Sequence, residues 1–301
     1  MRVFVTGASG HIASAVIPEL LRHGHQVVGL ARSDAAAAVV AGHGAEVRRG
    51  DLGDLDVLRS AAADADGVIH LAFDHGGLRE GKLAEAAQGE MDAVQAFGEA
   101  LAGTGKALVT TGGVLPLGMA GLNGRLGTEE DVFPGGPRID NENLTISLAE
   151  QGVRSAAVRL APMVHSDLDK HGFTPALIGF ARQNGFAAYI GDGANHWSAA
   201  NTYDIGVLYR LAVEKAPAGS RLHGVSDTAI PFRTVAETIA ARLGLEARSV
   251  TAEEAPQYLG FLGYFAGVDA PVSTDITRKL LGWEPARAGW VEDLQAEHYF
   301  A

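Results

Sequence analysis

Residues 2–13 read RVFVTGASGHIA, and the order of residue types in this stretch decides the fold. Arg2–Thr6 is a short run of β-branched and aromatic residues, which is typical of a buried strand. Across Ile12–Arg22 the apolar residues recur at the spacing of a helix. Gly7 and Gly10 lie between the two segments. The sequence therefore predicts a strand, a tight glycine turn and a helix that follow one another directly.

The alternation of strand and helix patterns continues far beyond this first unit. The expected strands are Gln26–Leu30, Ala45–Arg48, Gly67–Leu71, Ala107–Thr111 and Ser155–Leu160, and the expected helices are Asp34–Ala41, Leu55–Ala62, one near Met91–Leu101 and one near Ile139–Glu150. Repeated strand–helix–strand units with apolar strands imply a parallel sheet covered by helices on both faces. The predicted fold class is α/β, a Rossmann-type doubly wound parallel sheet formed by residues 1–162.

The pattern changes after Pro162, where longer loops separate the expected helices at Pro175–Gln183, Ile205–Glu214 and Thr234–Leu243. Residues 163–301 are predicted to form mainly a smaller C-terminal, substrate-side lobe, with some segments returning to the first sheet. Within this lobe, residues 257–265 are dense in aromatic and leucine side chains. This stretch is either a helix packed on the core or a mobile lid over a substrate, and the first alternative is the commoner one.

Composition excludes several classes of function. Lys and Arg total 24 against 36 Asp and Glu, a formal net charge of −12, so nucleic acid is not an expected partner. The chain contains no cysteine and therefore no disulfide, thiolate nucleophile or Cys-ligated metal. It also lacks an apolar run long enough to cross a membrane. We expect a cytoplasmic protein with neither a nucleic-acid nor a membrane partner.

The glycine turn has the features of a phosphate-binding site. Gly7 permits a tight turn and Gly10 lets the backbone approach a ligand closely, while Ala13 is small enough to keep the helix near the strand. The N-terminus of the helix offers free N–H groups and a partial positive charge, which suit the diphosphate of a dinucleotide. A purely structural glycine turn is the alternative.

The residues after the second strand indicate which dinucleotide would bind. An enzyme that uses NAD places Asp or Glu there to bond the ribose hydroxyls, whereas this chain has Ala31. Arg32 and Ser33 instead suit a ribose 2′-phosphate, because a guanidinium makes paired charge-assisted bonds to it. The prediction is NADP(H). The alternative is that Arg32 is a solvated surface residue and that Asp34 reaches the ribose.

Asp51 and Leu52 follow the third expected strand, where the adenine of a dinucleotide would lie. A carboxylate at this place can accept a hydrogen bond from the adenine amino group. An ordinary turn residue is the alternative for Asp51, and the sequence leaves both open.

These and later motifs resemble the short-chain dehydrogenase/reductase superfamily, in particular its extended or atypical branch of epimerase/dehydratase-like proteins. The matching segments span most of the chain: Thr6–Ala13 for the TGxxGxxG turn, Gly50–Leu52 for the adenine site, His70–Ala72 for the HLAA strand end, Val109–Thr111 for the Ser/Thr site, Arg159–His165 for the loop that passes the nicotinamide, and Asn201–Asp204 for a late motif ending in Asp. The glycine turn is fairly specific, and the set as a whole is much more so.

The resemblance extends the expected contacts with the cofactor. The residues predicted to bind NADP(H) are Gly7, Ser9, Gly10, His11, Ile12, Arg32, Ser33, Asp51, Leu52, Leu71, Ala72, Phe73, Thr110, Pro162 and Val164. Family members dimerise through the helices that correspond to Met91–Leu101 and Ile139–Glu150, so the resemblance also implies a homodimer.

The chain departs from the family at the catalytic pair. Members usually carry Tyr-x-x-x-Lys on the helix after the Ser/Thr site, but no tyrosine of this chain has a lysine four residues later. Arg138 and Glu142 occupy the expected region at the same spacing. On one helical face such a pair is normally a surface ion pair. The chain thus resembles the atypical members that lack the active-site Tyr and Lys.

Three residues are candidates for catalysis: Thr111, Arg138 and His165. Aligned to the family, Thr111 lies beside the nicotinamide and could bond a substrate carbonyl, although threonine is also an ordinary residue at a strand end. Arg138 could polarise a carbonyl but is a poor proton donor. His165 could move a proton, or serve as a structural histidine, which is the commoner role; His75 and His196 are weaker candidates.

The sequence thus predicts an NADP(H)-dependent oxidoreductase that transfers a hydride to or from a small carbonyl or alcohol. Two alternatives remain open. One is a sugar-nucleotide epimerase or dehydratase, as in the larger extended branch. The other is a non-catalytic NADP(H)-sensing protein, which the missing Tyr-Lys pair favours. No metal is expected, because the histidines lack a ligand spacing with a nearby carboxylate.

Overall fold

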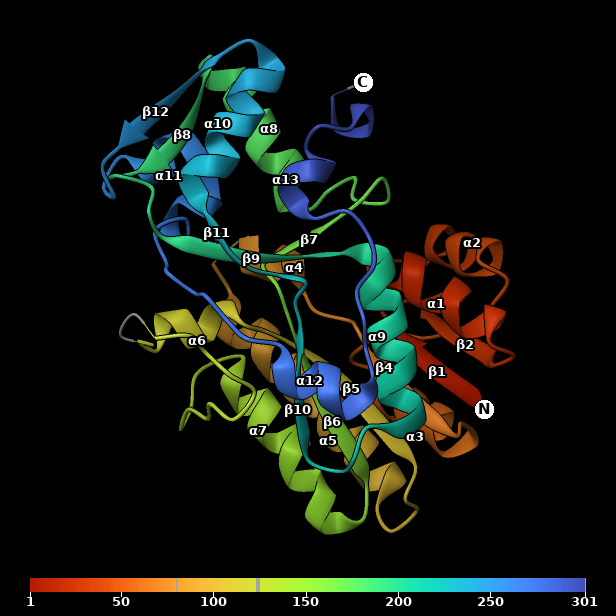
Figure 1. The fold of residues 1–301 in the computed structure, drawn as a ribbon. Coiled ribbons are helices and arrows are strands. Elements are labelled where there is room, and N and C mark those ends of the chain that lie inside the picture. Colours follow the sequence, from red (N-terminus) through yellow and green to blue (C-terminus); the bar gives the residue numbers. More distant parts are fainter. Residues whose placement is uncertain (80, 123–124, 301) are drawn as a thin grey trace.

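The computed structural model describes residues 1–79, 81–122 and 125–300, and its central element is a seven-stranded parallel sheet (Figure 1). In spatial order the strands are β10 (Ser220–Gly224), β6 (Arg154–Leu160), β5 (Ala107–Gly113), β4 (Gly67–His70), β1 (Arg2–Thr6), β2 (Gln26–Ala31) and β3 (Glu46–Arg49). The predicted doubly wound sheet is confirmed. Its strand order reverses at β1, and ligands of such sheets bind at the carboxyl ends beside this reversal.

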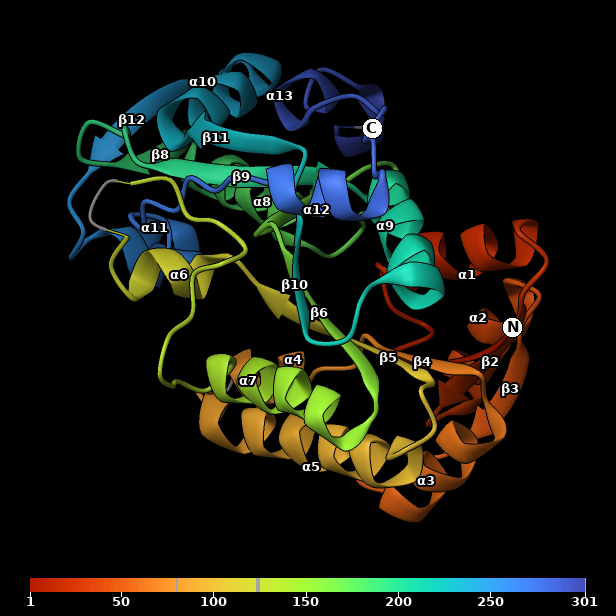
Figure 2. The same ribbon diagram turned by 60° about the horizontal axis from the view of Figure 1, so that its bottom comes forward.

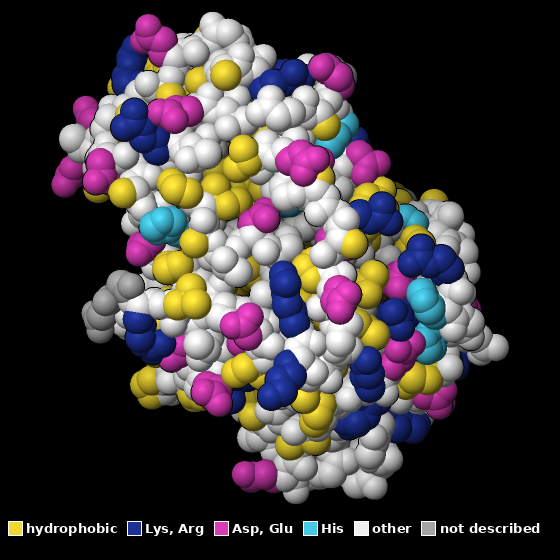
Figure 3. All heavy atoms as spheres, viewed as in Figure 1, with side chains coloured by type: hydrophobic (Ala, Val, Ile, Leu, Met, Phe, Trp, Pro, Cys, Tyr) yellow, Lys and Arg dark blue, Asp and Glu magenta, His cyan; other side chains and the backbone are white. Residues whose placement is uncertain are grey.

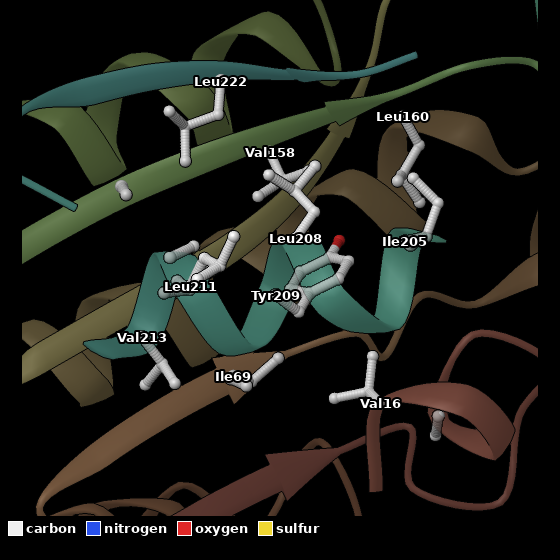
Figure 4. Packing of buried hydrophobic residues seen from close by; sticks show 14 of the residues in the cluster. Val16, Ile69, Val158, Leu160, Ile205, Leu208, Tyr209, Leu211, Val213 and Leu222 are labelled. Atoms are coloured by element: carbon white, nitrogen blue, oxygen red, sulfur yellow. The ribbon is translucent and has the colours of Figure 1, made fainter. Parts of the chain in front are cut away.

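Helices cover both faces of the sheet (Figure 2). One face carries α1 (Ala13–Arg22) and α9 (Thr202–Lys215), the other carries α3 (Leu55–Asp64), α5 (Leu83–Leu101) and α7 (Ile139–Ser147), and α2 (Asp34–Gly42) packs beside β2 and β3. Figure 4 shows Leu208 and Tyr209 of α9 in one buried cluster with Val158 of β6 and Ile69 of β4. Burial from both sides explains why the central strands β1, β2 and β4 are rich in apolar residues, whereas the edge strand β3 is not.

Shorter helices complete this part of the chain. They are α4 (His75–Arg79), α6 (Leu115–Met119) and the 3-10 turn η1 (Leu148–Gln151). Helix α5 begins at Leu83 rather than near Met91, because its apolar face continues through buried Ala86 and Ala87. Alanine adds little to a hydrophobic pattern, so the sequence signal for these first turns is weak.

The lobe has its own small sheets and core. Its strands form a three-stranded sheet of β11 (Asp227–Pro231), β9 (His196–Asn201) and β7 (Met163–His165), and a pair of β12 (Glu246–Val250) and β8 (Phe186–Ile190). Its helices are α8 (Phe173–Asn184), α10 (Phe232–Leu243), α11 (Ala255–Leu259) and α13 (Trp290–Asp293), with the 3-10 turns η2 (Gly260–Tyr264) and η3 (Glu297–Tyr299). Trp197, Phe232 and Trp290 are fully buried within this second core.

Three segments of the second half return to the first sheet. They are α9, β10 and α12 (Asp275–Leu281), and β10 forms the edge strand beside β6. The aromatic stretch at 257–265 packs on the lobe core through Leu259 and Leu262, while Tyr264 is exposed. Gly260, with φ of +54°, separates this stretch into α11 and η2.

The surface and the helices bear on possible partners. On the face drawn in Figure 3, Lys and Arg side chains are interspersed with Asp and Glu rather than gathered in one patch. Among the helices of the described ranges, none is both long and apolar enough to cross a membrane.

Candidate functional site

The glycine turn presses β1 against the end of β4. Gly7 has φ of +64°, and a Cβ added to it would lie 2.8 Å from the backbone nitrogen of Ala72. Such a distance is shorter than any ordinary contact, so only glycine fits here. The N–H of Gly10 donates to the carbonyl of Gly7 over 2.9 Å, which closes the turn.

The start of α1 offers unused donors. Within the described part of the chain, no acceptor is found for the backbone N–H of His11 or of Ile12. Ser9 and Gly10 are exposed beside them. Free N–H groups at the positive end of a helix, next to a turn that lacks side-chain bulk, fit the diphosphate of a dinucleotide.

Basic side chains flank the end of β2. Arg32 is exposed, and Ser33 caps α2 by accepting a hydrogen bond from the N–H of Ala36 over 3.2 Å. Asp34 is engaged with Arg49 over 2.9 Å, and strand register places Arg49 beside the last residue of β2. A guanidinium next to a helix N-terminus suits an anionic group, and the neighbouring Asp34 is paired with Arg49.

Asp51 forms a turn at the end of β3. Its carboxylate accepts the N–H of Gly53 over 3.1 Å, and its own N–H donates to Asp54 Oδ2 over 2.8 Å. Asp51 is exposed and Leu52 packs partly against the core. The turn role of Asp51 is therefore observed, and contact with adenine stays a prediction.

Thr111 lies in a hydrogen-bond cluster at the ends of β4 and β5. Its hydroxyl donates to the carbonyl of His70 over 2.8 Å and is 2.7 Å from the hydroxyl of Tyr209 on α9. The ring Nδ1 of His70 is 2.6 Å from Thr6 Oγ1, which also accepts the N–H of Ala72 over 3.3 Å. The only proton of the Thr111 hydroxyl is thus engaged within the fold.

Two neighbours of the Thr111 hydroxyl, His70 and Tyr209, are uncharged at neutral pH. Burial, with a smaller contribution from Arg138, lowers the pKa of His70 to about 3. Burial also raises the pKa of Tyr209 far above its ordinary value. Thr110 points to the opposite face of the sheet, where its hydroxyl is 3.0 Å from that of Thr145 on α7.

Arg138 joins this cluster from the N-terminus of α7. Its Nη2 donates to the carbonyl of Thr111 over 2.7 Å, and its guanidinium carbon lies 4.1 Å from the centre of the Phe73 ring. Nη2 is also 3.5 Å from Glu90 Oε1 on α5. The side chain remains 21% exposed. The structure therefore brings together two of the predicted catalytic residues, Thr111 and Arg138, beside Phe73.

Glu142 does not pair with Arg138. It is buried, and its carboxylate receives two bonds from Arg159, at 2.6 and 2.7 Å, and one from Arg221 at 2.6 Å. The surface ion pair expected from the i, i+4 spacing is therefore wrong. The reason is tertiary: β6 and β10 place two arginines beneath α7, whereas Arg138 turns to the ends of β4 and β5.

His165 lies away from the other two candidates. It is fully buried, and its Nδ1 is 2.8 Å from Asp293 Oδ2 on α13. Its carbonyl accepts the hydroxyl of Thr202, which is 2.9 Å from the Nε2 of His11. This chain of bonds connects the glycine turn to the C-terminal segment. Pro162 and Val164, in contrast, are partly exposed in the preceding loop.

The remaining histidine candidates have ordinary surroundings. His196 is 2.9 Å from Asp269 Oδ1 in an exposed pair, and His75 stacks edge-on against Phe73. In the ranges that the structure describes, no group of three His, Asp or Glu residues could hold a metal ion.

Two residues of the cluster escaped the sequence analysis, Glu90 and Tyr209. Glu90 lies on the apolar face of α5, in register with buried Ala86, Val94 and Phe97. A carboxyl on the apolar stripe of a helix is a usable signal, because such groups are rarely buried without a purpose. For Tyr209 no comparable signal exists, since tyrosine is common on the buried face of a helix.

The chain is similar to several known proteins. A model of the NAD dependent epimerase/dehydratase family matches residues 3–96. The uncharacterized protein C2A9.02 of Schizosaccharomyces pombe is 42% identical over 302 residues, which is 100% of both chains. The decarboxylating sterol-4-alpha-carboxylate 3-dehydrogenase of Dictyostelium discoideum is 24% identical over 247 residues, 77% of this chain and 73% of that protein.

A solved structure extends the likeness of fold to the whole chain. DesIV, a dTDP-glucose 4,6-dehydratase from Streptomyces venezuelae, superposes with a TM-score of 0.77 at 18% identity, covering 98% of this chain and 96% of that one. The sheet order, the glycine turn and these matches lead to one assignment. Residues 3–96 belong to a domain of the NAD dependent epimerase/dehydratase family, and the chain as a whole belongs to one family with the uncharacterized protein C2A9.02 and shares its fold with DesIV.

Proposed function

We propose that this protein is an NADP(H)-dependent oxidoreductase that transfers a hydride to or from a small carbonyl or alcohol. The observation that carries the proposal is the contact between Arg138 and the Thr111 carbonyl, because it places a cation at the carboxyl ends of β4 and β5. Gly7 lies against the end of the same β4 strand. A bound nicotinamide would supply the hydride chemistry, and the protein would supply position and charge.

The preference for NADP(H) rests on the end of β2. Arg32 is exposed there and has no acidic partner in the described chain, while Asp34 is held by Arg49. A 2′-phosphate would find a guanidinium and the N-terminus of α2 at this place. The ribose hydroxyls of NAD would find Ala31 rather than a carboxylate at the last position of β2.

Replacing Arg32 by alanine is expected to weaken NADPH binding roughly 10- to 100-fold and to leave NADH binding unchanged, because one charge-assisted contact is lost. Fluorescence titration of both cofactors measures the two affinities. Arg248→Ala, which removes an exposed arginine in the lobe, serves as the control and should change neither. Equal affinity of the wild-type protein for NADPH and NADH would refute the cofactor assignment.

In the proposed reaction Arg138 polarises the substrate oxygen. Only one of its nitrogens is engaged with Thr111, so further N–H groups of the planar fork remain to donate. The stack on Phe73 holds the guanidinium plane in place. The Thr111 hydroxyl can donate to the substrate only when it no longer donates its proton to the carbonyl of His70. His165 is proposed to hold the C-terminal segment through Asp293 rather than to transfer a proton, because it is enclosed.

Arg138→Ala is expected to lower kcat/KM for carbonyl reduction about 100-fold, the usual effect of losing one preorganised donor to a developing oxyanion. Thr111→Ala is expected to cost only about 5- to 10-fold, since its hydroxyl is already bonded within the fold. NADPH oxidation over a panel of carbonyl compounds measures both effects. Thr111→Ser keeps the hydroxyl and should restore most of the activity. Unchanged turnover in Arg138→Ala would remove this residue from the reaction.

A second candidate is a sugar-nucleotide epimerase or dehydratase. It is favoured by two solved structures that match over nearly the whole chain, DesIV with NAD and TYD bound and MoeE5 in complex with UDP-glucose and NAD. Calorimetry with UDP-glucose and dTDP-glucose, in the presence of either cofactor, separates the two functions. Binding of a sugar nucleotide without turnover of simple carbonyls would favour the second candidate, and NADPH binding with neither would favour a sensor.

A further inference from the structure

Helix α5 places a carboxyl beside Arg138 that the proposed reaction does not use. Glu90 is 1% exposed, and its Oε1 is 3.5 Å from Nη2 of Arg138. Its other oxygen, Oε2, is buried and bonds to nothing in the described chain. An unpartnered carboxyl oxygen next to a cation at a candidate active site calls for a physical explanation.

The charges around Glu90 are few. Among the described side chains, the titratable and charged groups on the helices packed against α5 are Asp56, Arg59 and Asp64 of α3, His75 of α4, and Arg138, Asp140 and Glu142 at α7. The sheet adds His70 of β4, and Tyr209 of α9 lies on its opposite face. Arg59 bonds to Glu99 near the end of α5, and Glu142 is taken by other arginines. Among the described residues, Arg138 is thus the cation that acts on Glu90.

Glu90 can hold or release a proton in the neutral range. Burial raises its pKa to about 7, and the attraction of Arg138 offsets only part of this rise. An ionised Glu90 draws the guanidinium into a charge-assisted contact. A protonated Glu90 leaves the positive charge of Arg138 uncompensated. The cation therefore exists in two electrostatic states.

We propose that Glu90 is a positioning residue for Arg138. Protonated Glu90 leaves the guanidinium free to bind the substrate oxygen, whereas ionised Glu90 competes with the substrate oxygen for the guanidinium. This inference rests on the proposed function in one respect, the orientation of Arg138 toward the substrate. The contact of 3.5 Å and the free Oε2 carry it, because a carboxyl that only stabilised the fold would have both oxygens bonded. Polarisation of the substrate then declines as pH rises.

The direct test follows the Arg138 side chain by ¹⁵N NMR from pH 5 to 9, with its signal identified by its loss in Arg138→Lys. In the wild-type protein the signal should shift with a midpoint near the pKa of Glu90, about 7. In Glu90→Gln, which keeps the shape and stays neutral, it should not shift. Glu99→Gln removes an exposed carboxyl from the same helix and should behave as wild type. A wild-type signal that does not titrate overturns the proposal.

The second measurement is the pH profile of NADPH oxidation. The sign follows from the raised pKa: the active, protonated form is present below pH 7 and is lost above it. We expect kcat to fall about tenfold between pH 6 and 8 in wild type and to stay level in Glu90→Gln, with KM for NADPH unchanged. A fall that persists in Glu90→Gln overturns the proposal. A titrating Arg138 signal without turnover of any carbonyl refutes the proposed function instead and leaves the Glu90–Arg138 link standing.

Discussion

Gly7→Ala is expected to abolish NADP(H) binding and to lower the free energy of unfolding by roughly 2–5 kcal/mol. Gly7 has φ of +64°, which costs an alanine backbone energy, and the new Cβ would lie 2.8 Å from Ala72 N and 2.9 Å from the carbonyl carbon of Leu71. Both atoms belong to backbone, so neither can move aside without displacing the end of β4. The same movement would carry the turn away from the diphosphate.

Gly24→Ala is the matched control for this change. Gly24 has φ of +79°, but nothing lies within 4 Å of an added Cβ. Its cost should be limited to the backbone term, about 1–2 kcal/mol, with cofactor binding unaffected. Urea unfolding measures the two stabilities and NADPH fluorescence the two affinities. Equal losses of stability, or NADPH binding by Gly7→Ala, would show that the turn does not press on β4.

Arg159→Met is expected to lower the free energy of unfolding by about 3 kcal/mol, because it removes one of the two arginines that compensate the buried carboxylate of Glu142. Arg159 is 1% exposed and makes two bonds to Glu142, and its Nη2 donates to the carbonyl of Asp131 over 2.6 Å. Methionine matches much of the length of arginine but offers no donor. Only Arg221 would then face the carboxylate of Glu142.

The loss of stability in Arg159→Met should depend on pH in a definite direction. Burial raises the pKa of Glu142, but bonds from Arg159 and Arg221 more than offset that, so the pKa lies below its ordinary value of 4.5. The contribution of Glu142 to stability is therefore present above pH 4.5 and lost as pH falls through the lower, folded-state value. The difference between wild type and Arg159→Met should be largest near pH 7 and should narrow in acid.

The exposed pair Arg233–Glu237, at the same i, i+4 spacing once expected for Arg138 and Glu142, supplies the comparison. Its side chains are 53% and 51% exposed. Arg233→Met should change stability by no more than about 0.5 kcal/mol, since solvent screens such pairs. Thermal or urea unfolding at several pH values gives both results. A cost for Arg159→Met as small as that of Arg233→Met would contradict the buried-pair account.

The fold and the glycine turn were predictable because their signals are contiguous. A strand, a glycine turn and a helix within residues 2–22 are each read from neighbouring residues, and repeated strand–helix–strand units imply a parallel sheet covered on both faces. The residues at the end of β2 were predictable for the same reason, since Arg32 directly follows Ala31, the last residue of the strand. Periodicity located most helices as well, and it was weakest at the alanine-rich start of α5.

The catalytic neighbourhood depended on contacts between residues far apart in the chain. Thr111 meets Tyr209 across 98 positions, and Arg138 meets the carbonyl of Thr111 across 27. Spacing along α7 predicted that Arg138 would pair with Glu142, yet separate tertiary partners drew the two side chains apart. The order of neighbouring residues along the chain thus specifies the shape of the backbone and the glycine turn. Which buried charge faces which, and therefore which pKa changes, is decided only when β4, β5, α5, α7 and α9 pack together.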